Sequence, residues 1–130
     1  MGLVPEAVLE KIPAMGSDPE TPLRDTMVHV RLFDPGSNWQ WFILEVGDNH
    51  TCFGLVVSRS VAVAGQFGLG ELSGLQDEDG IPSVRFDPDF EPLTVGELGS
   101  RLPSVAELLQ EPIPREINLV RDLVDLESDQ

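Results

Sequence analysis

Two tryptophans, Trp39 and Trp41, are the side chains of this sequence with the best placement for recognising a partner. They are two residues apart in the aromatic and β-branched stretch 39–46, which predicts a β-strand. Residues i and i+2 of a strand point to the same face, so both rings share one side of the predicted sheet. A pairing of Phe33 with Trp39 across the preceding turn places Arg31 opposite the second ring, where a cation–π contact is available. This face would stack nucleic-acid bases or receive the apolar anchor of a protein partner.

Acidic side chains form the second candidate surface. Residues 71–100 hold eight acidic residues and one arginine, a net charge of −7. Some of the acids lie in a turn that ends in Gly80, and others alternate with prolines, so we expect them at the surface. The acidic candidates for contact with a cationic partner are Asp77, Glu78, Asp79, Asp87 and Asp89. A calcium loop is excluded, because its first and twelfth positions would be Leu75 and Phe86, which carry no oxygen ligand.

The inventory for catalysis is small. Nucleophilic catalysis needs a nucleophile, a base and an orienting group that converge in space, and the bases that titrate near neutrality are His29 and His50. Cys52 is expected to pack as a small buried apolar residue. A zinc site needs about four Cys or His ligands, and the chain has three such residues. We therefore predict no catalytic residue, no metal site and no cofactor; an enzyme that acts through Asp87 or the histidines is the third interpretation.

Composition limits the partners. The chain has 130 residues, the size of one domain, and a formal net charge of −15. Duplex nucleic acid and anionic membranes both require a basic surface, so the charge favours a protein partner with a basic surface. A single cysteine and the lack of a signal peptide or an apolar membrane span predict a cytoplasmic protein. The oligomeric state stays open.

The elements that must position these residues form a sheet. Segments 26–33, 39–46 and 51–58 are predicted as strands, joined by short turns rich in Gly, Pro, Asp and Asn. Residues 66–69 are expected to add a fourth strand, and residues 83–86 a short edge strand. Short turns make neighbouring strands antiparallel. The predicted fold class is α+β, an antiparallel meander of three to five strands with C-terminal helices packed on the sheet.

The apolar pattern predicts a register for this meander. We expect Phe33 to face Trp39 and Val46 to face Thr51, because one face then becomes entirely apolar. The nine side chains of that face would be Val28, Val30, Leu32, Phe42, Leu44, Val46, Phe53, Leu55 and Val57. Both tryptophans would lie on the opposite face.

The chain divides into three predicted parts. Residues 1–25 form an N-terminal arm or short helix, residues 26–98 the antiparallel sheet domain, and residues 99–130 a helical segment of the same domain. Capping-box spacing, Thr or Ser followed three residues later by Glu, occurs at Thr94 and Glu97 and at Ser104 and Glu107. Residues 115–126 have the apolar spacing of an amphipathic helix. The alternative to a recognition role of the tryptophan face is that this helix covers it through Leu119 and Leu123.

A family resemblance covers residues 26–98. Its most specific part is the run from Asp34 and Pro35 to Ser37, Asn38 and Trp39, followed by Trp41. Further matching positions are 28–33, Glu45, 53–56, Gly65, Phe67, Leu69, Glu71, Leu72, Asp87, Phe90 and Pro92. In these positions the chain resembles bacterial domain-of-unknown-function family 2958, which is common on plasmids, integrative elements and phages. The segment before Gly65 and the residues at 85–86 depart from that family's pattern.

The resemblance implies a phage or mobile-element setting and no activity. Together with the charge, it predicts a non-catalytic acidic interaction protein that binds a DNA-handling or defence protein, with inhibition of that protein as one possible consequence. The alternative is a single-stranded nucleic-acid module that uses the Trp39 and Trp41 face.

Overall fold

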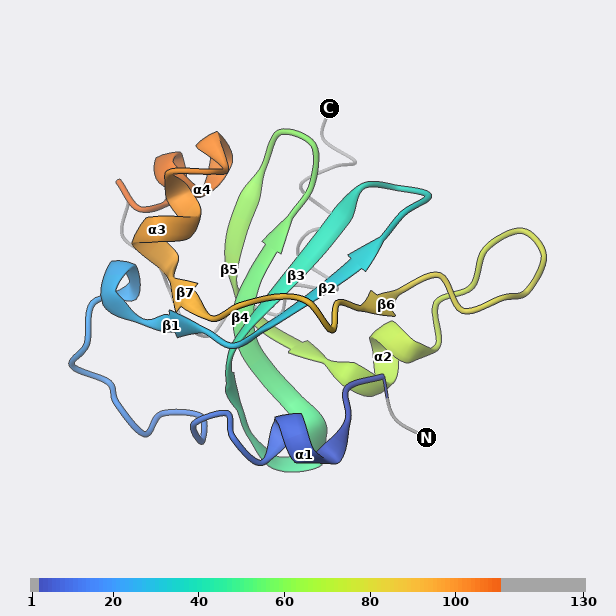
Figure 1. Cartoon of the computed structure of the whole chain (residues 1–130), viewed down its shortest axis with the longest axis horizontal. Helices are drawn as coiled ribbons and strands as arrows, with labels where there is room; N and C mark the ends of the chain where they lie inside the picture. The colour runs from blue at the N-terminus through green and yellow to red at the C-terminus, as the bar shows by residue number, and fades with distance from the viewer. Residues whose placement is uncertain (1–2, 111–130) are drawn as a thin grey trace.

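The computed structural model describes residues 3–110; residues 1–2 and 111–130 lie outside the described part. Five strands form an antiparallel sheet in the order β5-β4-β3-β2-β6 (Figure 1). These strands are β2 (Val30–Asp34), β3 (Trp39–Val46), β4 (Thr51–Val57), β5 (Ala62–Gly68) and β6 (Arg85–Phe86). A second antiparallel sheet pairs β1 (Met27–Val28) with β7 (Leu93–Thr94). The α-helices within residues 3–110 are α1 (Glu6–Leu9), α2 (Leu69–Ser73), α3 (Val95–Gly99) and α4 (Pro103–Leu108), and the 3-10 helices are η1 (Leu23–Asp25) and η2 (Asp48–His50).

Short turns produce the meander β2-β3-β4-β5. At the β2–β3 turn, Asp34 Oδ1 accepts a hydrogen bond from the Gly36 N–H at 2.9 Å, and the Asn38 N–H donates to the Asp34 carbonyl at 2.9 Å. Asn38 has φ +66°, a left-handed conformation that Asn tolerates better than most residues. At the β4–β5 turn, the Ser58 N–H donates to the Val61 carbonyl at 2.8 Å. The predicted α+β class, with an antiparallel meander and helices on the C-terminal side, is confirmed.

The sheet has an apolar core on each face. The arm-side core joins the sheet to the N-terminal arm and α2; its buried members are Val4, Leu9, Ile12, Val30, Leu32, Trp41, Ile43, Cys52, Val56, Phe67, Leu69, Leu72 and Val84. The helix-side core joins the sheet to α3 and α4; its buried members are Val28, Phe42, Leu44, Phe53, Leu55, Val57, Ala62, Ala64, Leu93, Val95, Leu98 and Val105. The central strands β3 and β4 contribute apolar side chains to both cores, because the arm and α2 cover one face of the sheet and α3 and α4 cover the other.

The predicted register of the first hairpin is wrong by one residue. Asp34, and not Phe33, pairs with Trp39, so Arg31 lies opposite Phe42. The bonds of Asp34 and the left-handed Asn38 close a four-residue loop, whereas the prediction assumed a loop of five residues. A shift of one residue exchanges the two faces of a strand.

The predicted nine-residue apolar face is therefore wrong as well. Six of its members lie in the helix-side core, but Val30 and Leu32 lie in the arm-side core, with Val46 packed against that core. The expected strand 26–33 breaks at His29, whose N–H donates to the Ile43 carbonyl at 2.9 Å, and β1 leaves to pair with β7. Residues on the two sides of this break consequently enter different cores.

The second hairpin follows the predicted register only in its first half. Phe42 pairs with Leu55 as expected, but a β-bulge between Ile43 and Glu45 shifts the pairing, and Val46 faces Cys52 instead of Thr51. Leu44 is the extra residue of the bulge. A bulge inserts one extra residue into one strand, and the residues beyond it point to the opposite face from the one that strict alternation predicts. The apolar pattern along β3 therefore does not reveal where the face changes.

The other predicted elements have mixed outcomes. The arm helix, the fourth strand and the edge strand are present as α1, β5 and β6, and the capping box of Thr94 and Glu97 starts α3. The second capping box is wrong: α4 starts at Pro103 and has no side-chain cap, because Pro is itself favoured in the first helical turn. The predicted helix 115–126 lies outside the described residues. No helix within residues 3–110 has the length and apolar character needed to cross a membrane.

Candidate functional site

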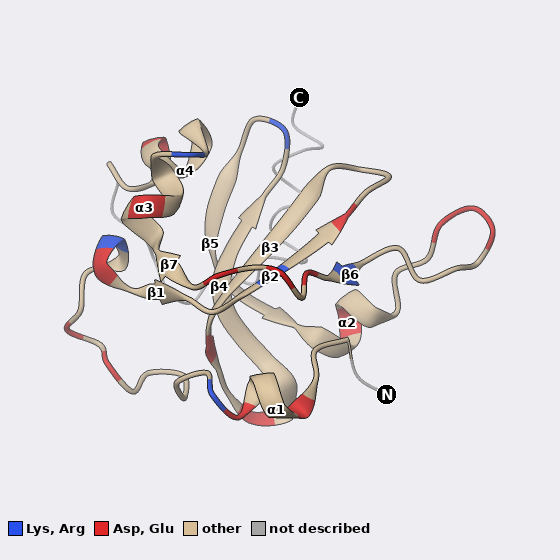
Figure 2. Cartoon of the chain, viewed as in Figure 1, with Lys and Arg blue, Asp and Glu red and all other residues tan. Residues whose placement is uncertain are grey.

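A hairpin-like loop between α2 and β6 carries three of the predicted acidic residues. We call residues 75–83 the acidic loop. It extends away from the sheet, and its tip is acidic (Figure 2). The Asp77 N–H donates to the Ile81 carbonyl at 2.9 Å and the Ser83 N–H to the Leu75 carbonyl at 3.1 Å. These bonds, with a bridge between Gln76 and Pro82, give the loop a defined shape.

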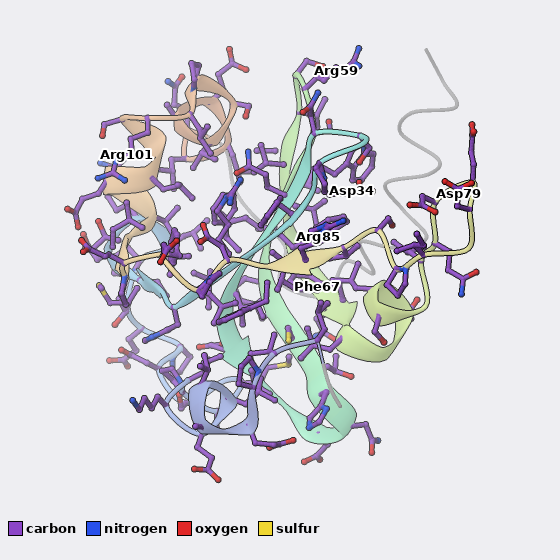
Figure 3. The ribbon with its side chains drawn as sticks, turned by 45° about the vertical axis from the view of Figure 1, so that its right-hand side comes forward. Asp34, Arg59, Phe67, Asp79, Arg85 and Arg101 are labelled. Atoms are coloured by element: carbon purple, nitrogen blue, oxygen red, sulfur yellow. The ribbon has the colours of Figure 1, made fainter. Side chains whose placement is uncertain are left out.

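Asp77 shapes the tip of this loop. Its Oδ1 accepts hydrogen bonds from the N–H groups of Asp79 at 2.9 Å and Ile81 at 3.0 Å. Gly80 next to it has φ +77°, which glycine adopts without steric cost. Glu78 and Asp79 make no ion pair within residues 3–110, and Asp79 lies at the outer end of the loop (Figure 3). Asp77 therefore orders the turn, while Glu78 and Asp79 present their charge to solvent.

The acidic loop also exposes apolar side chains that the sequence analysis missed as binding residues. Leu75 is 46% exposed and Ile81 is 53% exposed, the two highest values among large apolar residues of the described chain. Leu75 and Ile81 lie on the two arms of the loop, each next to the bridge between Gln76 and Pro82. One feature of the sequence could have indicated their exposure. Leu75 and Ile81 flank a charged turn, and neither belongs to a segment with the apolar spacing of a strand or helix.

Arg31 and Asp87 form an internal ion pair. Arg31 Nη1 donates to Asp87 Oδ2 at 2.9 Å, and Arg31 Nε donates to Gln40 Oε1 at 2.8 Å. The guanidinium also lies 4.6 Å from the centre of the Phe33 ring. The expected cation–π contact with Trp41 is wrong, because the shifted register places Arg31 on the opposite face of the sheet from that ring.

Asp87 ties the segment after β6 to the sheet. Its N–H donates to the Arg31 carbonyl at 3.0 Å, and its Oδ1 accepts from the Asp89 N–H at 3.0 Å. Asp89 itself is exposed. Of the predicted acidic residues, Asp87 is therefore mainly structural, and Glu78, Asp79 and Asp89 are available to a partner.

The two tryptophans share a face as predicted. Their ring centres are 6.2 Å apart with a 35° angle between the planes. Trp41 is only 5% exposed, whereas Trp39 is half-buried at the margin of the arm-side core. The expected cover through Leu119 and Leu123 lies outside the described residues. Of the two indole rings, that of Trp39 is the one that offers surface to a ligand in the described structure.

The candidate catalytic residues differ in their burial. Cys52 is buried, and burial raises the pKa of its thiol to about 12. His50 is exposed, and its Nε2 lies 3.8 Å from Glu6 Oε1. Partial burial lowers the pKa of His29. Residues 3–110 contain no group of three or more His, Cys, Asp and Glu side chains placed to hold a metal ion.

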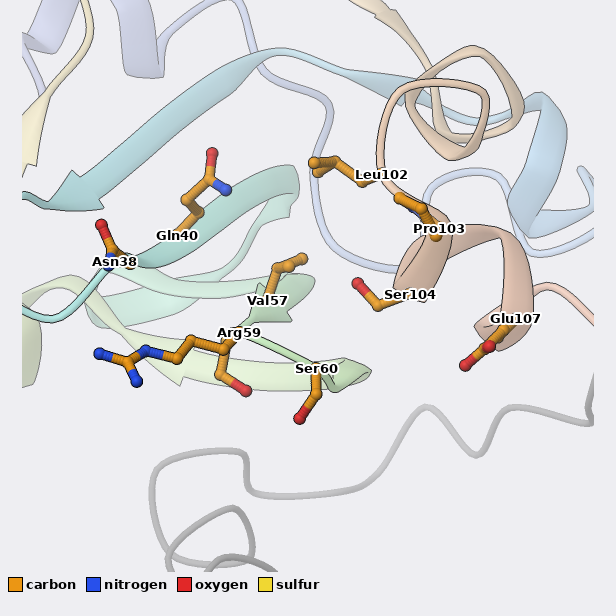
Figure 4. A pocket seen from close by; sticks show the side chains of 10 residues that line it. Asn38, Gln40, Val57, Arg59, Ser60, Leu102, Pro103, Ser104 and Glu107 are labelled. Atoms are coloured by element: carbon orange, nitrogen blue, oxygen red, sulfur yellow. The ribbon is translucent and has the colours of Figure 1, made fainter.

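Two surface hollows have linings that mix polar and apolar side chains. The first, about 340 Å³, lies between Gln40, the β4–β5 turn at Arg59, and α4 at Glu107 (Figure 4). The second, about 320 Å³, lies between the N-terminal arm and the sheet, beside His29 and Glu45. Glu45 is 3% exposed and its Oε1 accepts a hydrogen bond from the Gly16 N–H at 3.2 Å. The sequence analysis missed both, because each hollow joins segments that are distant in the chain.

Comparison of the chain with protein-family models, curated proteins and solved structures found no match. The resemblance of residues 26–98 to the bacterial family, and the phage or mobile-element setting that it implies, therefore stay predictions.

Proposed function

We propose that this protein is a non-catalytic interaction protein whose acidic loop binds a protein with a basic surface. The observation that carries the proposal is the combination, on one preordered loop, of two solvent-facing acids with two exposed apolar side chains. Stable interfaces use apolar anchors for affinity and surrounding charges for association rate and specificity. The anchors here are Leu75 and Ile81, and the charges are those of Glu78 and Asp79.

The charge of the whole chain supports the same partner. The formal net charge of −15 attracts a cationic surface from a distance and repels nucleic acid and other polyanions. In the setting implied by the family resemblance, the partner is a DNA-handling or defence protein, since such proteins carry basic surfaces for the phosphate backbone. Occupation of that surface by the acidic loop would inhibit the partner.

The alternative, single-stranded nucleic-acid binding through the tryptophan face, has less support. Stacking needs exposed rings, and Trp41 is buried. The cation expected beside the rings, Arg31, is held by Asp87 and Gln40.

Affinity purification from a plasmid- or phage-bearing bacterial host, with the full chain as bait, tests the proposal. The loop variant combines Asp77→Asn, Glu78→Gln and Asp79→Asn. Asn at position 77 keeps an oxygen acceptor for the turn, so the loop retains its shape while it loses three charges. A matched control removes three exposed charges from other elements, with Glu10→Gln, Glu20→Gln and Glu107→Gln.

The purified partner should bind the loop variant about fivefold more weakly than the native chain, because the two solvent-facing acids, Glu78 and Asp79, form peripheral charge pairs worth about 0.5 kcal/mol each. The control variant should lose less than half as much binding free energy as the loop variant. Leu75→Ser with Ile81→Ser should weaken binding further and at all salt concentrations. Equal loss in the loop variant and the control, or no specific partner at all, would refute the proposal.

A further inference from the structure

Strand β5 is one margin of the five-stranded sheet, so half of its main-chain groups face away from β4. The β4–β5 turn shows which half this is. There the Ser58 N–H donates to the Val61 carbonyl, which makes residues 58 and 61 a hydrogen-bonded pair. Such pairs alternate with non-hydrogen-bonded pairs along an antiparallel ladder, so residues 61, 63, 65 and 67 bond to β4. The residues whose N–H and C=O groups point outward are Ala62, Ala64 and Gln66, and in the described part of the chain these groups make no main-chain hydrogen bond to another element.

This edge lacks the features by which proteins prevent edge-to-edge pairing. Strands β4 and β5 pair over the whole of β5 without a bulge, and residues 61–68 contain no charged residue and no proline. The opposite edge of the sheet is protected. Strand β6 has two residues, one of which is Arg85, and Pro88 follows it closely. Strand β5 is therefore the edge that accepts a further strand.

The charges that flank β5 are symmetric in position and opposite in sign. Arg59 lies six residues before Gly65, and Glu71 lies six residues after it, in α2. Both side chains are exposed, and the length of β5 between them, about 23 Å, prevents an ion pair within one chain. A second, antiparallel β5 strand centred on Gly65 would place each Arg59 beside the Glu71 of the other copy. The edge is thus complementary in charge to itself.

The same alignment pairs apolar side chains across the two copies. Val63 would face Phe67 of the second copy, and Val61 would face Leu69 of the second copy. Val63 is half-buried and Val61 is 38% exposed, so both have apolar surface to lose on association. Phe67 and Leu69 belong to the arm-side core, and the apolar row on that face would continue from one copy into the next.

We propose that two copies of this chain associate by antiparallel pairing of their β5 strands about a two-fold axis at Gly65. The two five-stranded sheets then form one continuous sheet. Ala64 and Gln66 of each copy exchange main-chain hydrogen bonds with Gln66 and Ala64 of the other, about four bonds in all. A two-fold interface uses the same surface of both copies, which is what the symmetric charges of Arg59 and Glu71 fit. The proposal does not depend on the acidic loop, and its failure would leave the proposed function untouched.

Sedimentation equilibrium of the unmodified full-length chain measures the association. The net charge of −15 on each copy opposes pairing, so the experiment uses about 0.3 M salt to screen this repulsion. The mass should rise with concentration from 14.2 kDa to twice that value and no further. A chain that stays monomeric up to millimolar concentration would overturn the proposal.

A charge exchange tests the alignment. Arg59→Glu and Glu71→Arg should each weaken the dimer roughly tenfold, because two attractive pairs become repulsive, and the chain with both changes should recover the native affinity. General repulsion predicts a different pattern, since Arg59→Glu makes the net charge −17 and Glu71→Arg makes it −13. Arg24→Glu, an exposed change of the same size in η1, is the matched control and should leave the affinity nearly unchanged. Far-UV circular dichroism verifies the fold of each variant, and a double variant that fails to recover would refute the alignment on Gly65.

Hydrogen exchange gives an independent readout in the unmodified chain. The N–H groups of Ala64 and Gln66 should exchange slowly in the dimer and faster after dilution to the monomer. The Val63 N–H, which bonds to β4, is the internal control and should stay protected at both concentrations. Protection of Ala64 and Gln66 that does not change on dilution would show that the edge is covered within one chain, and it would overturn the proposal.

Discussion

Gly54 provides the sharpest test of the observed strand register. It lies in β4 opposite Ile43, directly before the bulge at Leu44. A Cβ atom at position 54 would lie 2.0 Å from the carbonyl oxygen of Phe42 and 3.2 Å from the Cα of Ile43. Both are backbone atoms of the central strand, so no side-chain rotation relieves the contact. Gly54→Ala therefore requires β3 and β4 to separate by at least 1 Å, because real Cβ atoms essentially never come within 3.0 Å of such atoms.

The cost follows from the position of this contact. Overpacking in a core costs about 1–3 kcal/mol, and here it also strains the hydrogen bonds between the two central strands. We expect Gly54→Ala to lower the free energy of unfolding by about 3 kcal/mol. At about 3–5 °C per kcal/mol for a chain of this size, the melting temperature should fall by about 10–15 °C. Circular dichroism melts and urea unfolding at neutral pH measure both quantities.

Gly70→Ala is the matched control. Gly70 lies in α2, and no atom lies within 4 Å of a Cβ built there. Alanine is favoured over glycine in a helix by roughly 0.5–1 kcal/mol, so this variant should melt at the native temperature or slightly above it. A Gly54→Ala chain that melts within about 2 °C of the native protein would refute the close approach of β3 and β4 on which the register depends.

Three further predictions concern individual side chains. Asp87→Asn should destabilise the fold by about 1 kcal/mol, with a smaller effect in high salt, because Arg31 loses the charge of its partly buried partner; urea unfolding at two salt concentrations measures this. Thr94→Ala should cost about 1 kcal/mol through loss of the capping box. The hydrogen bonds from Thr94 lower the pKa of Glu97 in the folded chain. Ionised Glu97 therefore stabilises the fold at pH values above its unfolded-state pKa, and this contribution is lost as the pH falls through its folded-state pKa. An NMR pH titration of the Thr94→Ala chain should place the Glu97 pKa closer to its ordinary value. The Cys52 thiol, with its pKa raised to about 12 by burial, should react with a thiol reagent only after the chain is unfolded.

Local chemistry determined much of the fold from the sequence. Alternating apolar residues and short turns predicted the strands later found as β3 and β4, and the Thr94 and Glu97 spacing predicted the start of α3. Gly80 and the acids before it predicted the turn of the acidic loop. These features depend on neighbouring residues and on backbone preferences, which a sequence displays directly.

The candidate site was predictable only in part. The acidic residues of the loop were found from charge and turn chemistry, and the shared face of Trp39 and Trp41 from strand periodicity. The exposure of Leu75 and Ile81 could not be found in this way, because it depends on the absence of packing neighbours. The engagement of Arg31 by Asp87 joins residues 56 positions apart, beyond any local pattern.

The tertiary structure alone decided which face each strand residue occupies. The four-residue turn after Asp34, the break at His29 and the bulge at Leu44 each change the phase of the alternation by one residue. Because the central strands are apolar on both sides, a one-residue shift exchanges one apolar set for another, and the sequence offers little penalty against the wrong register. The sequence determined that these strands exist and pair as a meander, and packing against the arm and the C-terminal-side helices determined how they align.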